Sequence, residues 1–291
     1  MITELGHTHP PLHQVRAIVQ RALDEDIGGG DVTTDNAVPP DQRSRAVLLA
    51  KQDGVLCGGR VFAETLALVD PAVAVDLLMP DGAAIGKGDV VARIEGPTRA
   101  LLTGERTALN FVQRLSGIAT ATAAFVARLG GLPTRLVDTR KTTPGLRVLE
   151  KYAVRVGGGH NHRFNLADAV LLKDNHLAAL RSRGLDLASA IRTVRGRIPH
   201  TMRIEVEVTS LDQIDDALAG GADIVLLDNM KPEEMRAAVG RIAGRALTEC
   251  SGTVTLETVR ERAETGVDLI SSGALTHSAR ALDLSLELEG S

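Results

Sequence analysis

The sequence predicts an α/β protein in which a mixed α+β domain precedes a closed or nearly closed α/β barrel. The chain has 291 residues, enough for about two domains. Beyond Gly117, short apolar runs alternate with helical stretches, which is typical of βα repeats around a parallel sheet. The later runs end at nearly equal intervals, about one strand, one helix and their loops apart. This regularity favours a barrel.

The first domain is predicted over residues 1–116. Strand patterns cover residues 45–50 and 90–95, and a helical pattern covers 61–69. The Gly-punctuated segment 81–96 is similar to small carrier modules, but Lys87 lacks their sequence context, and we interpret it as part of a tight turn. Gly28 to Gly30 are likewise interpreted as a turn, because no apolar strand precedes them.

The barrel domain is predicted over residues 117–275. A helix is expected over the C-terminal residues 276–291, joined to the first domain. Six runs are the predicted barrel strands: residues 135–138, 169–173, 203–208, 223–228, 246–251 and 268–272.

Composition excludes several classes of function. Lys+Arg 33 against Asp+Glu 37 gives a net charge of -4, so no overall basic field attracts nucleic acid or anionic lipid. The aromatic content of 2% leaves few platforms on which bases could stack. Cys57 and Cys250 form no metal or disulfide pattern, and neither a signal peptide nor an apolar run of membrane length is visible. We expect a cytoplasmic protein without nucleic-acid or membrane partners.

Cations gather where the first two barrel strands end. Active sites of α/β barrels lie at the carboxyl ends of the strands. Here the sequence places Arg140, Lys141, Arg163 and Lys173, which suit an anion with several carboxylates or phosphates. His160 and His162 lie between them, and we interpret them as positioning or hydrogen-bonding residues because a third metal ligand is missing.

The next strands carry acids, and the last two end in glycine turns. Glu205 and Glu207 face the same side of one strand, and Asp228 ends the next. These carboxylates could hold Mg²⁺ or sugar hydroxyls, and an ion pair with Lys173 is compatible with either role. Backbone N–H groups at two turns predict a phosphate site. These turns are Ser251, Gly252, Thr253 and Ser272, Gly273, Ala274.

Ordered motifs along nearly the whole chain resemble the quinolinate phosphoribosyltransferases. The resemblance implies an incomplete α/β (TIM-like) barrel with an N-terminal α+β domain. The motifs are EDIGGGDVTT (25–34), ERTALNF (105–111), QRLSGIAT (113–120), DTRKTTPG (138–145), GGGHNHR (157–163), LKDNH (172–176), IEVEV (204–208), LDN (227–229) and GALTH (273–277).

The resemblance assigns roles to the predicted site residues. Thr139 and Lys141 would lie at the pyrophosphate, and Glu207 and Asp228 would take the ribose hydroxyls and Mg²⁺, in part through substrate or water. The two Ser-Gly turns would hold the 5′-phosphate, although Thr253 replaces a glycine that many members have. The residues implied around quinolinate are Arg106, Arg140, His162, Arg163 and Lys173.

The resemblance also implies a reaction and an assembly. Phosphoribosyl diphosphate and quinolinate would give nicotinate mononucleotide, pyrophosphate and CO₂, a step of NAD biosynthesis. Arg106 would enter the site of a neighbouring subunit, which implies a homodimer or a larger homo-oligomer.

Three other interpretations stay open at this point. A ModD-like paralogue of the same fold would act on another pyridine or heterocycle, although the chain length and the arginine set argue against it. Lys173 at a strand end could form a Schiff base, as in barrel aldolases. A scaffold without catalysis would require the charges at the strand ends to be coincidental.

Overall fold

The computed structural model describes residues 9–289, which belong to two compact units. Unit 1 contains the described parts of residues 1–123, 142–158 and 275–291, and unit 2 contains residues 124–141 and 159–274. The boundary predicted near Gly117 lies inside a single long helix, α4 (Thr98–Leu129). Within residues 9–289, no helix is long and apolar enough to span a membrane.

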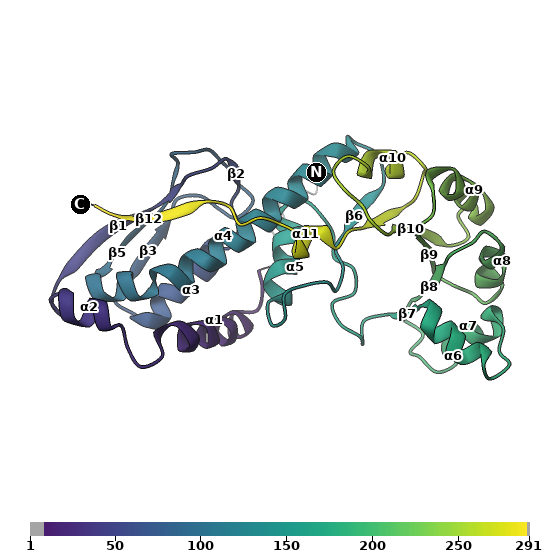
Figure 1. Cartoon of the computed structure of the whole chain (residues 1–291), viewed down its shortest axis with the longest axis horizontal. Coiled ribbons are helices and arrows are strands. Elements are labelled where there is room, and N and C mark those ends of the chain that lie inside the picture. The colour runs from purple at the N-terminus through teal and green to yellow at the C-terminus, as the bar shows by residue number, and fades with distance from the viewer. Residues whose placement is uncertain (1–8, 290–291) are drawn as a thin grey trace. The chain divides into compact units, whose positions relative to one another are not determined.

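Unit 1 is built on an antiparallel sheet with the strand order β12-β1-β5-β3 (Figure 1). The predicted strands and helix of this region are confirmed as β1, β5 and α3. Phe62 and Leu66 of α3 pack with Leu48 of β1 in a core that water does not reach. The elements are α1 (Leu12–Ile27), α2 (Val32–Ala37), β1 (Arg43–Ala50), β2 (Gly54–Val55), α3 (Gly59–Val69), β3 (Ala74–Leu77), β4 (Ala84–Ile85), β5 (Val90–Pro97), most of α4, α5 (Arg147–Val156) and β12 (Leu284–Leu288).

The helix predicted over residues 276–291 is wrong. The short helix α11 (Ala274–His277) ends at His277, and β12 then pairs antiparallel with β1. Leu282, Leu284, Leu286 and Leu288 occur at every second position, which is the period of a strand and not of a helix. Leu282 and Leu284 accordingly enter the core of unit 1.

Both glycine-rich segments outside the barrel are turns, as predicted. Lys87 lies between β4 and β5, and its neighbour Gly88 has a φ of 99°. Gly28 and Gly30 also have positive φ and connect α1 to α2. The carboxylate of Asp31 then caps α2 by accepting a hydrogen bond from the Thr34 N–H.

Unit 2 contains a parallel sheet with the strand order β6-β11-β10-β9-β8-β7. All six predicted runs are strands, so the βα pattern is confirmed. The elements are β6 (Arg135–Val137), β7 (Val170–Leu172), α6 (Asp174–Arg181), α7 (Leu187–Arg195), β8 (Ile204–Val208), α8 (Asp212–Ala219), β9 (Ile224–Asp228), α9 (Pro232–Ile242), β10 (Leu247–Ser251), α10 (Val259–Ala263) and β11 (Leu269–Ser271).

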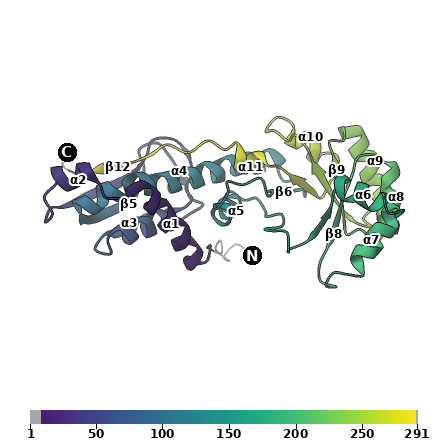
Figure 2. The same cartoon turned by 60° about the horizontal axis from the view of Figure 1, so that its bottom comes forward.

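Helices cover the outer face of this sheet, and polar side chains lie on its inner face. Helices α7, α8 and α9 follow one another along the outside of the strands (Figures 1 and 2). Strands β6 and β7 are the edges of the sheet, and a parallel bridge between Val137 and His160 adds a further short pairing beside β6. This arrangement agrees with the predicted incomplete α/β barrel.

Candidate functional site at the carboxyl ends of the strands

A cavity of about 160 Å³ opens at the carboxyl ends of the unit 2 strands. It brings most of the predicted quinolinate and pyrophosphate residues together within one compact unit. The residues lining it are Thr139, Arg140, Lys141, His162, Arg163, Leu171, Lys173, Leu226, Glu249, Ser251 and Ser271.

The segment after β6 supplies the first cations. Thr139 Oγ1 accepts a hydrogen bond of 3.0 Å from the Lys141 N–H, which fixes the turn that carries Arg140. The Nε atom of Arg140 is buried and hydrogen-bonds to no group in residues 9–289. A buried guanidinium nitrogen in this state favours an anionic ligand in the cavity.

Asp138 holds the histidine segment beside β6. Its two carboxylate oxygens accept hydrogen bonds from the His162 N–H at 2.9 Å and from the Asn161 amide at 2.6 Å. Asp138 is fully buried, so this anchor lies within the unit. Asp138 thereby fixes the Asn161 side chain and the backbone at His162, and so also the position at which Arg163 begins.

Arg163 reaches into an environment that is unfavourable for a cation. Its Nη1 donates to the Ala169 carbonyl at 3.1 Å. Burial, followed by repulsion from Arg140, lowers the pKa of the Arg163 guanidinium. Two neighbouring guanidinium groups that repel each other are both stabilised when an anion binds between them.

Glu207 and Asp228 form the acidic side of the site, and Lys173 pairs with Glu207. Lys173 Nζ lies 3.6 Å from Glu207 Oε2, so the ion pair considered from the sequence is present. The pKa of Glu207 is raised, chiefly by burial and also by Asp228 and Asp174, while Lys173 opposes the shift. Glu207 and Asp228 lie at the carboxyl ends of the adjacent parallel strands β8 and β9.

These carboxylates fit a magnesium ion. Mg²⁺ prefers oxygen ligands and is usually held by one or two carboxylates plus substrate phosphates. Half-buried Glu207 and Asp228 offer such oxygens at the ends of adjacent strands, and a cation would relieve their mutual repulsion.

The predicted phosphate turns have unusual backbone geometry. Gly252 has a φ of 123°, and Asn229 on the neighbouring turn has a φ of 52°. The Asn229 N–H donates to the Ser251 carbonyl at 3.2 Å, which links the turns after β9 and β10. The Ser272 N–H donates to the Val137 carbonyl, so this amide is already hydrogen-bonded to the neighbouring strand β6.

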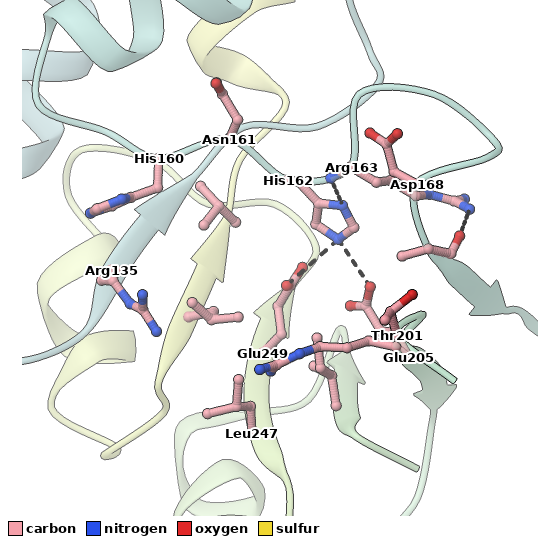
Figure 3. Close-up of a pocket in the computed structure, with 15 residues that line it drawn as sticks. Arg135, His160, Asn161, His162, Arg163, Asp168, Thr201, Glu205, Leu247 and Glu249 are labelled. Atoms are coloured by element: carbon pink, nitrogen blue, oxygen red, sulfur yellow. Dashed lines mark hydrogen bonds and ion pairs between the residues drawn. The ribbon is translucent and has the colours of Figure 1, made fainter. Parts of the chain in front are cut away.

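A second cavity of about 630 Å³ lies inside the barrel and reaches toward the start of the strands (Figure 3). His162, Arg163 and Glu249 line both cavities. His162 Nε2 lies 3.0 Å from Glu205 Oε2 and 3.7 Å from Glu249 Oε2. Burial and then repulsion from Glu205 raise the pKa of Glu249 to about 7.

Glu249 is the site residue that the sequence interpretation missed. It lies in the middle of β10, whereas the predictions considered the strand ends, and it is 1% exposed. A signal was present, because a carboxylate inside an apolar strand needs a partner in the core. Its partner, His162, is distant in sequence.

Arg106 is not among the residues that line the cavity. It is an exposed residue of α4 in unit 1, whereas the cavity belongs to unit 2. Its predicted role across a subunit interface therefore stays a prediction.

The parallel strands of the incomplete barrel, with cations and carboxylates at their carboxyl ends, define a barrel protein whose site suits a small polyanion. Comparisons with known proteins specify it further. Residues 31–116 match the model of the quinolinate phosphoribosyl transferase N-terminal domain, and residues 118–287 match that of the C-terminal domain. The chain belongs to the quinolinate phosphoribosyl transferase family.

Individual relatives align over nearly the whole chain. A probable nicotinate-nucleotide pyrophosphorylase [carboxylating] of Bacillus subtilis is 42% identical over 275 residues, covering 94% of this chain and 93% of the relative. The nicotinate-nucleotide pyrophosphorylase [carboxylating] of Mycobacterium leprae is 43% identical over 282 residues, covering 94% and 96%. The crystal structure of NadC from Streptococcus pyogenes matches with a TM-score of 0.92 at 44% identity, covering 96% and 98%.

Proposed function

We propose that the protein is a quinolinate phosphoribosyltransferase (decarboxylating). It transfers the phosphoribosyl group of phosphoribosyl diphosphate to quinolinate and releases pyrophosphate and CO₂, giving nicotinate mononucleotide for NAD biosynthesis. The observation that carries the proposal is the meeting of Arg140, Arg163 and Lys173 in one cavity beside Glu207. Relatives with this named activity, at 42% identity over most of the chain, support it.

The cavity suits a flat dicarboxylate. Arg140 and Arg163 bind the two carboxylates of quinolinate, because planar guanidinium groups pair bidentately with such anions. Lys173 adds a third positive charge, and Arg106 of a neighbouring subunit adds a fourth in a homodimer or larger assembly. The low aromatic content agrees with recognition by charge.

The second substrate lies across the carboxylate edge. Glu207 and Asp228 face the ribose hydroxyls and Mg²⁺, and Thr139 and Lys141 face the pyrophosphate. The backbone turns at Ser251, Gly252, Thr253 and at Ser272, Gly273, Ala274 bind the 5′-phosphate. When bound, Mg²⁺ neutralises charge on the diphosphate.

Positioning accounts for the chemistry that the chain supplies. The pyridine nitrogen attacks C1 of the ribose as the C1–O bond to diphosphate breaks, and Lys141 offsets charge on the leaving group. The ring then carries a positive charge on nitrogen. The C–C bond to the adjacent carboxylate breaks, CO₂ leaves, the electron pair is drawn toward the pyridinium, and a proton takes the vacated carbon.

The test is an assay with quinolinate, phosphoribosyl diphosphate and Mg²⁺, with nicotinate as a parallel substrate. Equimolar nicotinate mononucleotide, CO₂ and pyrophosphate from quinolinate alone are expected. Turnover of another pyridine would favour the ModD-like alternative, and a borohydride-trapped adduct on Lys173 would favour the aldolase alternative. Cys57 and Cys250 are buried and are not joined in a disulfide, which agrees with a protein that functions in a reducing cytoplasm.

A further inference from the structure

Both ring nitrogens of His162 are engaged by groups of the protein itself. Nδ1 accepts a hydrogen bond of 2.7 Å from the Arg163 N–H, and Nε2 faces Glu205 and Glu249 (Figure 3). A nitrogen that accepts a hydrogen bond carries its lone pair there and no proton. The proton of the neutral ring therefore lies on Nε2, where it points at the carboxylates.

Glu205 is the hydrogen-bond acceptor for that proton, and the second carboxyl group, Glu249, lies 3.7 Å from Nε2. Glu205 is 2% exposed and Glu249 is 1% exposed. The Oε1 atom of each is buried and hydrogen-bonds to nothing in residues 9–289. The Nε2–H group lies 3.0 Å from Glu205 Oε2, and hydrogen bonds from a neutral donor to a buried carboxylate are stronger than those between neutral groups.

A metal at this cluster is disfavoured by the same hydrogen bonds. The ligand atoms of His162, Glu205 and Glu249 lie within 4.8 Å of one another, as a metal site would require. A metal on Nε2 would displace its proton, however. Since Nδ1 already accepts from Arg163, the ring would have to become an anion.

These contacts of His162 also fix the position of Arg163. Its N–H is fixed by His162, and its guanidinium is held by the Ala169 carbonyl. His162 is itself held on its other side, where its N–H donates to Asp138. The backbone that carries Arg163 is thus fixed from the barrel interior.

We infer that Glu205 and Glu249 are positioning residues that hold His162 as its Nε2–H tautomer, and that His162 acts by fixing Arg163 for the anionic substrate. The importance for quinolinate rests on the proposed function. The resemblance places His162 among the residues around quinolinate, and the structure adds that this histidine also acts through the Arg163 backbone.

Nitrogen NMR of the full-length, ¹⁵N-histidine-labelled protein tests the tautomer. His162→Gln identifies the His162 signal by its loss, and the exposed His200 is the internal reference. We expect an Nε2–H, Nδ1-unprotonated pattern in the ligand-free protein at pH 7, unchanged when quinolinate is added. A proton on Nδ1, before or after quinolinate, would overturn the inference.

Two substitutions at His162 test the function of the hydrogen bond. His162→Asn places an amide oxygen near the position of Nδ1 and keeps an acceptor for the Arg163 N–H, whereas His162→Gln reaches toward Glu205 and lacks it. We expect KM for quinolinate to rise about tenfold more in His162→Gln than in His162→Asn, the equivalent of one hydrogen bond. KM for phosphoribosyl diphosphate should change little.

The two arms separate this inference from the proposed function. An equal or reversed KM effect would overturn the positioning role. If the wild-type protein does not turn over quinolinate, the proposed function fails, and the NMR measurement on the ligand-free protein still decides whether the carboxyl pair fixes the tautomer.

Discussion

Gly252 lies so close to Asn229 that a Cβ atom on Gly252 would be 2.4 Å from the Asn229 side-chain oxygen. Both residues have positive φ, and they follow the adjacent strands β9 and β10. The turn after β9 and the turn after β10 therefore lie in close contact beside the predicted phosphate site. The backbone conformation at 252 therefore favours glycine, and a Cβ atom there would also force the Asn229 side chain to move.

We expect Gly252→Ala to weaken phosphoribosyl diphosphate binding and to lower stability by about 1–3 kcal/mol, because the backbone is strained and Asn229 must move. KM values and urea unfolding measure the two effects. Gly221→Ala is the matched control, since Gly221 has a φ of 83° but no neighbouring atom within 4 Å of the place that an alanine Cβ would take. Equal KM values in the two variants would contradict the prediction.

Arg140→Ala should lower kcat/KM with quinolinate. The loss of transition-state stabilisation should be about 3 kcal/mol. The buried Nε of Arg140 points to an anion that the wild-type site binds and the variant loses. Steady-state kinetics provide the value, and exposed Arg197→Ala provides the control for loss of a positive charge from unit 2. An Arg140→Ala enzyme with unchanged kcat/KM would remove this residue from the site.

The strands of the barrel could be predicted because each is a short apolar run that ends in a polar residue, as in residues 223–228. The same rule located the cationic mouth at Arg140 and Lys173. It failed for β12, where the alternating leucines were interpreted as a helix. It also missed Glu249, because burial of a mid-strand carboxylate is stabilised by His162, a contact that only the folded sheet creates.

Arg114→Ala should destabilise the protein by about 3–5 kcal/mol, because it leaves a buried carboxylate without its positively charged partner. Arg114 Nη2 lies 2.8 Å from Glu150 Oε1, and the Glu150 side chain is fully buried. Arg260→Ala breaks the exposed pair with Glu264 and should cost about 0–1 kcal/mol. Chemical denaturation compares them, and similar losses in both variants would refute the argument.

Glu249 should make stability fall as pH rises. Its pKa is raised from 4.5 to about 7 in the folded protein, so between these values the folded state holds a proton that the unfolded state releases. The stabilisation is complete below about pH 4.5 and is lost up to pH 7, with a limiting slope of about 1.4 kcal/mol per pH unit. Glu249→Gln cannot titrate, so its stability relative to the wild-type protein should increase over this interval. A constant difference between the two proteins would contradict the prediction.

Glu207→Gln should raise the Mg²⁺ concentration that gives half-maximal activity by about tenfold, a change of roughly 1.4 kcal/mol. The reason is that a neutral amide oxygen attracts the ion less than a carboxylate that is already repelled by Asp228. Asp174→Asn is the control, because Asp174 also raises the pKa of Glu207 but begins helix α6 on the exposed surface. Activity is measured over a series of Mg²⁺ concentrations after removal of metal with a chelator. If both variants require the same Mg²⁺ concentration as the wild-type protein, Glu207 does not hold the ion, and the carboxylate edge serves the ribose hydroxyls alone.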